Sequence, residues 1–288
     1  MVRLQFSVEL QYDVAPPGGD FIFNIHAAHT QQQIVQTENL QVSQPVPFTI
    51  DTDPASRNRY LRLQAQPGPL SVLYEATVDI YHYTAAPGEL GEVPVCQLPG
   101  AVLPYIYPSR YCQSDRLQKL ASNEFGHLPQ GYSRAQAICQ WVQQRVSFES
   151  NSSHGSTSAI DTVVERVGVC RDFAHLMIAL CRAVNLPARF ATGIDYGADP
   201  ALGPTDFHAY VEVYLGHRWY MFDPSGTAIP MGFVRFATGR DAADAAFAML
   251  FGSVTSSAPV IHIQAVPDGY GQLVVPQHVS HALSTDGL

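Results

Sequence analysis

The first 85 residues of the chain alternate apolar and polar side chains, which is the pattern of β-strands with one buried face. In residues 4–12, LQFSVELQY, every second side chain is apolar. The alternation returns in residues 21–27, 60–66 and 73–83, and turns rich in proline and glycine separate the runs. Short strands that bury one face are typical of antiparallel sheets. We therefore expect an antiparallel β-sandwich or barrel over residues 1–85.

The next stretch, residues 86–113, fits neither a helix nor a central strand. Five prolines fall between residues 84 and 113, and each proline removes a backbone donor that a helix or an inner strand would need. Apolar residues between these prolines favour a segment that packs against the protein. We expect an extended connector, docked on the surface of the domain that follows.

Apolar residues take helical spacing after the connector. The clearest helix covers residues 170–184, and its apolar face is formed by Phe173, Leu176, Met177, Leu180 and Val184. Asn185 and Pro187 are typical residues at the end of a helix. Further helices are expected over residues 114–126, 132–146, 158–168 and 241–252. Ser133 is the expected N-cap of the second of these, and Ser158 with Asp161 has the spacing of a capping box at the start of the third, which Gly168 would end.

Strands are expected between the later helices and after them. Apolar and alternating runs predict strands over residues 188–195, 207–215 and 218–223. A hairpin of residues 260–266 with 272–275 should follow, and the final residues are polar and expected to be loosely held. The fold class expected is therefore α+β, with the β-rich domain followed by an α+β domain over residues 114–288.

Composition narrows the class of protein. The chain has 288 residues, which suits about two domains, and 46% of them are hydrophobic, enough for sizeable cores. Its formal charge is −9 and no run of lysine or arginine occurs, so nucleic-acid binding is not expected. No apolar stretch approaches the roughly 20 residues of a membrane span. The first residues lack the apolar block of a signal peptide.

The number and spacing of the cysteines predict neither structural disulfides nor a metal site. The five cysteines, an odd number without a CxxC pair, make neither a disulfide framework nor a zinc site. A reducing cytoplasm is the simplest location for such a chain. A metal site built from Cys170, His175 and His208 has no recognised spacing, and we expect no metal or other cofactor.

Cys170 is the cysteine with the strongest chemical context. It stands where a glycine-containing turn runs into the helix of residues 170–184. Unpaired backbone N–H groups and the positive end of the helix dipole favour a thiolate there, and the same N–H groups could hold an oxyanion. A cysteine that only packs in the core fits the position too, and from position alone that is the more frequent case.

The strands of residues 207–215 and 218–223 bring a histidine and an aspartate together. The loop Gly216–His217 has two residues with glycine first, as a type II′ hairpin turn requires. This register places Asp223 opposite Tyr210, and His208 shares the face of Tyr210. His208 and Asp223 are then diagonal neighbours at roughly 7–8 Å between backbones, within reach of their side chains.

Cys170, His208 and Asp223 together supply the parts of a nucleophilic enzyme. His208 would take the thiol proton and pass it to the leaving group, while Asp223 would fix the imidazole tautomer. Taken singly, His208 fits a half-buried structural histidine, and Asp223 fits a turn residue before a proline. His175 lies five residues after Cys170 and projects from another side of the helix.

Two segments carry a resemblance to a known family. GVCRDFAHLMIALCRAVNLPARFATG and DFHAYVEVYLGHRWYMFDPSG resemble the bacterial transglutaminase-like superfamily, whose pattern is a Gly-x-Cys at a helix start, a His leading one strand and an Asp-Pro-Ser/Thr closing the next. The upstream YPSRYCQSD and the β-rich start of the chain resemble members that carry a bacterial transglutaminase N-terminal domain.

The resemblance implies a papain-like α+β core and acyl transfer at an amide bond through a thioester. It implies that Cys170 is the nucleophile, His208 the base and Asp223 the orienting residue. The superfamily includes cross-linking transglutaminases, peptidases and amidases, so the acyl acceptor stays open. Gln144 or a residue of the polar loop 149–158 could supply a second oxyanion donor.

We expect a cysteine protease or amidase that acts on a protein or peptide amide, without nucleic acid or membrane. A protein-glutamine transglutaminase is the first alternative. The second is a non-catalytic peptide-binding module that retains the fold, and a third is a scaffold whose N-terminal sandwich recruits a partner. In an enzyme, that sandwich is expected to dock or orient the substrate. The oligomeric state is not predicted.

Overall fold

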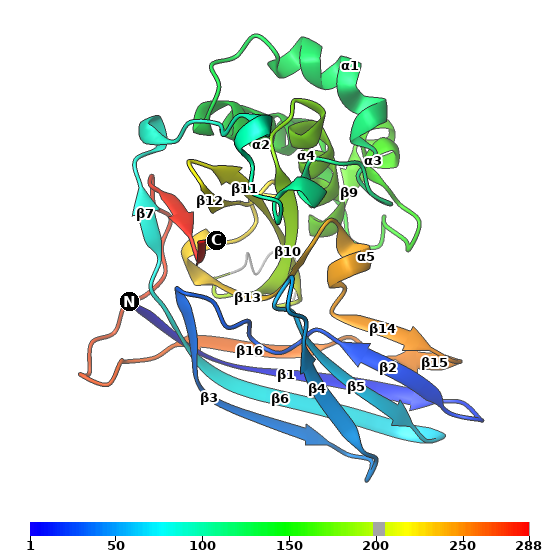
Figure 1. Ribbon diagram of the computed structural model, residues 1–288. Helices are drawn as coiled ribbons and strands as arrows, with labels where there is room; N and C mark the ends of the chain where they lie inside the picture. Colours follow the sequence, from blue (N-terminus) through cyan, green and yellow to red (C-terminus); the bar gives the residue numbers. More distant parts are fainter. Residues whose placement is uncertain (198–204, 288) are drawn as a thin grey trace.

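The computed structural model describes residues 1–197 and 205–287. Two antiparallel sheets form the lower part of the molecule, and a mixed helix and sheet layer stands above them (Figure 1). The fold class is therefore α+β, as expected, with the antiparallel sheets first along the chain.

The larger lower sheet is built on two long strands that pair along their whole length. Its strands are β1 (Val2–Val14), β3 (Gln33–Val42), β6 (Gly68–Ile80), β15 (Val254–Ser256) and β16 (Val260–Ala265). The second lower sheet has the order β14-β2-β5-β4, with bounds β2 (Gly19–Phe23), β4 (Phe48–Thr52), β5 (Arg59–Ala65) and β14 (Ala248–Phe251). Alternate side chains of β1, β6, β2 and β5 are buried in one core, which confirms the sandwich pattern of these strands.

Two strands within residues 1–85, β3 and β4, were not expected from the sequence. β4 has no buried residue, and most residues of β3 stay at least partly exposed. β4 is short and β3 lacks a regular apolar alternation, so their pairing with a neighbouring strand identifies them. β3 pairs with β6 and β4 pairs with β5.

The upper layer centres on a sheet with the order β13-β10-β11-β12-β18. Its strands are β10 (Ala188–Asp195), β11 (His208–Leu215), β12 (Arg218–Phe222), β13 (Phe233–Gly239) and β18 (Asp286–Gly287). The helices are α1 (Ser114–Phe125), α2 (Tyr132–Arg145), α3 (Ala159–Glu165), α4 (Cys170–Ala183) and α5 (Ala242–Ala245). Helix α4 is buried between the other helices and strands β10 and β11, which explains its nearly complete burial.

Short elements join these parts. They are β7 (Tyr83–Ala85) paired with β17 (Ala282–Ser284), β8 (Ser147–Phe148) paired with β9 (Val167–Gly168), and the 3₁₀ turns η1 (Pro87–Glu89), η2 (Val95–Gln97), η3 (Leu103–Tyr105) and η5 (Pro230–Gly232). Apolar residues of the proline-rich segment, including Val93 and Val102, pack on Tyr214 and Trp219 of the upper sheet.

The predictions of a helix over residues 241–252 and of a hairpin after it are wrong. Helix α5 ends at Ala245, and the chain then forms β14, which pairs with β2. β16 pairs with β1, and residues 272–275 form no strand. Tertiary pairing overrides local pattern here, because the open edges of the N-terminal strands accept these segments. Residues 248–265 therefore complete the N-terminal sheets instead of extending the second domain.

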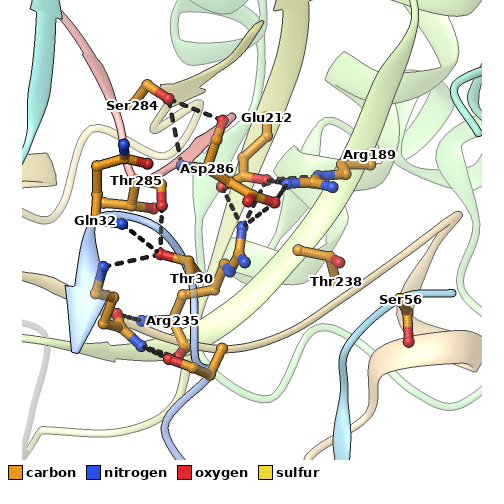
Figure 2. A network of polar contacts seen from close by, with 12 residues as sticks. Thr30, Gln32, Ser56, Arg189, Glu212, Arg235, Thr238, Ser284, Thr285 and Asp286 are labelled. Atoms are coloured by element: carbon orange, nitrogen blue, oxygen red, sulfur yellow. Dashed lines mark hydrogen bonds and ion pairs between the residues drawn. The ribbon is translucent and has the colours of Figure 1, made fainter. Parts of the chain in front are cut away.

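Residues 282–287 are buried, whereas the final residues were expected to be loosely held. β18 pairs with β12, and the side chain of Asp286 accepts hydrogen bonds from Arg189 (2.7 Å) and Arg235 (3.1 Å) (Figure 2). Glu212 completes this network beside Arg189. Polar residues at the chain end indicate solvent exposure from sequence alone, but here they compensate two buried arginines.

Three local predictions at helix ends and turns also need correction. Helix α2 begins at Tyr132 after Gly131, so Ser133 is not its N-cap. The capping box of Ser158 is present, but α3 ends at Arg166 in the left-handed region, and not at Gly168. The Gly216–His217 turn has positive φ at both residues, 52° and 65°, which makes it type I′ and not II′. Both types join two strands through two residues, so the predicted register is unaffected.

Candidate active site

Cys170 is the first residue of α4, and the residues around it fix that helix start. The Asp172 carboxylate is fully buried and accepts hydrogen bonds from the Val169 N–H and the Ser153 hydroxyl, both at 2.9 Å. A Cβ at Gly168 would lie only 2.7 Å from Cβ of Asp172. The Gly-x-Cys spacing therefore has a steric cause: glycine leaves the space into which Asp172 folds back. The thiol of Cys170 stays partly exposed.

His208 begins β11, and Asp223 directly follows β12. The observed pairs Leu215 with Arg218 and Val213 with Tyr220 confirm the predicted register. Nε2 of His208 lies 3.3 Å from Oδ1 of Asp223. The Cys170 sulfur lies 3.9 Å from the carbonyl oxygen of Phe207, the residue before His208, and lines the same cavity as the imidazole. The structure thus brings together all three residues singled out from the sequence.

Asp223 is held by the residues that follow it. Its Oδ1 accepts from the backbone N–H (3.0 Å) and the hydroxyl (2.6 Å) of Ser225, and its Oδ2 accepts from the Ala228 N–H at 3.1 Å. Burial alone would raise the pKa of Asp223, but His208 and these donors together lower it. The serine of the Asp-Pro-Ser motif therefore keeps the carboxylate ionised and oriented.

A second carboxylate faces the imidazole from the opposite side. Asp195, the last residue of β10, places Oδ2 3.9 Å from Nδ1 of His208, and its Oδ1 accepts a 2.9 Å hydrogen bond from the Tyr210 hydroxyl. β10 pairs with β11 so that Gly193 lies opposite His208. Asp195 thus shares the face of His208, two residues further along.

The two carboxylates set the charge of the imidazole. Burial would lower the pKa of His208, but Asp195 and Asp223 outweigh that effect and raise it well above its usual value. Burial raises the pKa of Asp195 to about 7, and the charge of Asp223 adds to the rise. The imidazole is therefore favoured as imidazolium between its two acidic neighbours.

These groups line a cavity of about 690 Å³. Its wall includes Cys170, Asp195 and His208, the polar loop at Ser150, Asn151 and Ser153, and the apolar segment Ala246–Ala248. Phe207 and Phe247 stack within this wall, with ring centroids 4.1 Å apart. Phe247 also packs against the N-terminal core, so the sandwich contributes to the wall.

The two candidates for a second oxyanion donor differ in whether they line the cavity. Gln144 is exposed on α2 and is not among the described residues that line the cavity. The polar loop does line it, and Arg171 ties that loop to α4 by donating to the Ser153 hydroxyl (2.5 Å) and to the His154 carbonyl (3.0 Å). The loop is thus the better of the two candidate segments.

His175 and the other cysteines lie outside the site. His175 is fully buried beneath Tyr111, with ring centroids 4.9 Å apart, and accepts a hydrogen bond from the Ala242 N–H. Burial, followed by Arg171 and Arg182, lowers the pKa of His175 well below its usual value, which keeps it neutral. All five cysteines are unpaired. The cytoplasmic location expected from the sequence stays a prediction.

A second cavity, of about 720 Å³, lies on the outer face of the N-terminal sandwich. Its lining is mostly polar and includes Ser7, Glu38 and His262, but no cysteine. The chemistry of a thiol, an imidazole and a carboxylate places the candidate active site in the first cavity. Of the helices in the described part of the chain, none has the length and apolar character needed to cross a membrane.

Comparison with known proteins gives the family. Residues 118–224 match the transglutaminase-like superfamily, and residues 2–101 match the bacterial transglutaminase N-terminal domain. The crystal structure of a "putative cysteine protease" from Cytophaga hutchinsonii is similar over 98% of this chain and 97% of that one, with 39% identity and a TM-score of 0.89.

Curated relatives match over a shorter range. An uncharacterized protein from Mycobacterium leprae is 27% identical over 115 residues, which cover 38% of this chain and 41% of that protein. An uncharacterized protein from Mycobacterium tuberculosis is 30% identical over 109 residues, or 34% of this chain and 35% of that protein. The chain thus spans about two fifths or less of the length of these mycobacterial relatives.

Proposed function

This chain belongs to the transglutaminase-like superfamily, and we propose that it is a cysteine protease or amidase whose catalytic residues are Cys170, His208 and Asp223. One observation carries the proposal: the His208 imidazole contacts the carboxylate of Asp223 and shares a cavity wall with the thiol of Cys170. The resemblance to the Cytophaga hutchinsonii protein supports it.

Acylation would begin with the Cys170 sulfur as nucleophile. The sulfur attacks the amide carbonyl carbon, and the backbone N–H groups at the start of α4 face the oxyanion that forms. The imidazolium of His208 then donates its proton to the amide nitrogen as the C–N bond breaks. The amine leaves, and the acyl group stays on sulfur as a thioester.

Deacylation would use water as the acceptor. His208, now neutral, takes a proton from water as the oxygen attacks the thioester carbonyl carbon. The C–S bond breaks and releases a carboxylic acid and the Cys170 thiolate, with the proton left on His208. An amine in place of water would give transamidation by the same steps, so the acceptor distinguishes a hydrolase from a transglutaminase.

The apolar wall supports a role for the N-terminal sandwich in binding substrate. Phe247 joins the N-terminal core to the cavity and stacks on Phe207, the residue before His208. The sulfur of Cys170 lies 3.9 Å from the Phe207 carbonyl oxygen. A substrate side chain that lies on this pair would place its carbonyl near the thiol.

The test is product analysis of an amide library that contains glutamine, asparagine and peptide amides. Hydrolysis yields free acids, transamidation with an added primary amine yields new amides, and Cys170→Ala yields neither. Cys96→Ala is the matched control, because Cys96 is an exposed thiol and is not among the described residues that line the cavity. Equal binding of peptides by wild type and Cys170→Ala, with turnover by neither, would favour the peptide-binding module.

A further inference from the structure

Asp195 is a buried ionisable group that the proposed reaction does not require. Its side chain is 1% exposed, and only one of its two oxygens is satisfied, by Tyr210. No described residue donates a hydrogen bond to Oδ2. That oxygen faces Nδ1 of His208 at 3.9 Å, on the side of the imidazole opposite Asp223.

We propose that Asp195 is a positioning residue, which holds the Nδ1 proton of His208 whenever the Cys170 sulfur is not available to accept it. This inference rests on the proposed function, because it assigns Asp195 a part in the same cycle. In the free enzyme Oδ2 faces Nδ1, and the Cys170 sulfur lies in the same cavity wall as the imidazole, where it can accept the Nδ1 proton as a thiolate. In the thioester the imidazole is neutral and Nδ1 carries no proton. When Nδ1 takes a proton from water, the sulfur is still bonded to the acyl carbon and carries no negative charge, so Asp195 is the anionic partner of the new Nδ1–H.

The surroundings of Asp195 favour this part over a purely structural one. A buried carboxylate is costly unless a charge or hydrogen bonds compensate it. The groups that face it are His208 and Tyr210 from β11, Asp223 beyond β12 and Cys170 from α4. On β13 its pairing partner is Phe233, which brings no charge. His208 is thus the cation that compensates it.

Titration of Asp195 near neutrality would make this interaction depend on pH. Burial and Asp223 bring the pKa of Asp195 to about 7, against the opposing effects of His208 and Tyr210. Above that pH both carboxylates are charged and the imidazolium has two partners. Below it, Asp195 is neutral and Asp223 remains the charged partner of the imidazole.

The test measures the His208 imidazole directly, without any substrate. The full chain is labelled with ¹⁵N, His208 is assigned among the eleven histidines through His208→Gln, and its titration is followed by NMR. Asp195→Asn removes the charge and keeps the shape. We expect the midpoint of His208 to fall by about one pH unit, since an opposite charge at this range shifts a pKa by roughly 1–3 units.

Asp244→Asn is the matched control, because Asp244 is a carboxylate of the same domain that pairs with Arg240 at the surface. It should leave the His208 midpoint unchanged. Tyr210→Phe is the second variant: it frees Oδ1 and weakens the anionic form of Asp195, so the midpoint should move in the same direction by less. Thermal melting establishes that each variant is folded.

An unchanged His208 midpoint in folded Asp195→Asn, or in folded Tyr210→Phe should Asp195→Asn not fold, would overturn the inference. That outcome is separate from failure of the proposed function. The NMR titration reports the Asp195–His208 interaction even if no amide is turned over. Conversely, amide turnover together with an unchanged His208 midpoint in Asp195→Asn would support the proposed enzyme and contradict the role of Asp195. If turnover is found, the limb of its pH profile that belongs to His208 should move with the NMR midpoint.

Discussion

Nε2 of His208, the first residue of β11, lies 3.3 Å from Oδ1 of Asp223, which directly follows β12 of the same hairpin. Replacing Asp223 by Asn keeps the shape but removes the charge that supports the imidazolium. We expect kcat to fall by about 10³-fold, within the range for loss of an orienting carboxylate. Ser225→Ala removes only one donor to Asp223 and should cost much less. A kinetic comparison of both variants with wild type checks this, and equal loss in the two would contradict it.

The glycine before the nucleophile gives a steric prediction. In Gly168→Ala the new Cβ would meet Cβ of Asp172 at 2.7 Å, so Asp172 must move and release the Val169 N–H. We expect a loss of about 1–3 kcal/mol in the free energy of unfolding, as for overpacked cores. Gly88→Ala has open space around its Cβ and should be nearly neutral. Denaturant unfolding of both variants measures the difference, and similar stabilities would show that this close contact is readily relieved.

The stacked phenylalanine pair gives a prediction about substrate binding. Phe247→Ala removes the ring that stacks on Phe207 and opens the apolar wall. We expect KM for substrates with apolar side chains to rise about tenfold, which is the effect of losing roughly 1.4 kcal/mol of binding, with a smaller change in kcat. Phe251→Ala is the control, because Phe251 lies on β14 with 56% of its surface exposed. An equal rise in KM for Phe251→Ala would contradict a role of the Phe207–Phe247 wall in substrate binding.

The buried network at the chain end gives a prediction about stability. Burial opposes ionisation of Asp286, but Arg235 and Arg189 lower its pKa to about 2. Because the folded pKa lies below the unfolded value of about 3.9, this stabilisation is present above pH 4 and is lost as the pH falls toward 2. Asp286→Asn should lower the free energy of unfolding by about 3 kcal/mol at pH 7, since it leaves two buried arginines with one carboxylate fewer.

Thermal or denaturant unfolding of wild type and Asp286→Asn from pH 7 down to pH 2 checks that prediction. The difference between the two proteins should shrink as the pH falls, because protonated Asp286 resembles asparagine. A constant difference over this range would mean that packing at the chain end, and not the charge of Asp286, provides the stabilisation.

Local patterns predicted that Cys170, His208 and Asp223 lie close together, because the position of each has a short-range cause. Helix periodicity locates Cys170 at a helix start, and a two-residue turn fixes the register of His208 against Asp223. The error in turn type was harmless, since types I′ and II′ share that register. Asp195 escaped prediction because β10 and β11 are joined by a long connection, which leaves their register free. Once Gly193 is known to pair with His208, Asp195 follows from alternation.

Long-range pairing explains the errors in the last part of the chain. The run DAADAAFAMLFG has helical composition, yet β14 forms because β2 offers it an edge. In the same way, β16 has the alternation of a hairpin strand, but it pairs with β1, which lies some 250 residues earlier in the chain. Ile261, for example, pairs with Val8. A local pattern identifies a strand without identifying its partner.

Alkylation of Cys170 by iodoacetamide at pH 6.5 tests the central claim, convergence of the thiol and the imidazole, most directly. Peptide mapping compares its rate with that of Cys96, which is more exposed and does not line the cavity that holds His208. Support of the thiolate by His208 predicts that Cys170 reacts about tenfold faster than Cys96, and that His208→Ala removes this advantage. Alkylation of Cys170 no faster than that of Cys96, and unaffected by His208→Ala, would contradict the account.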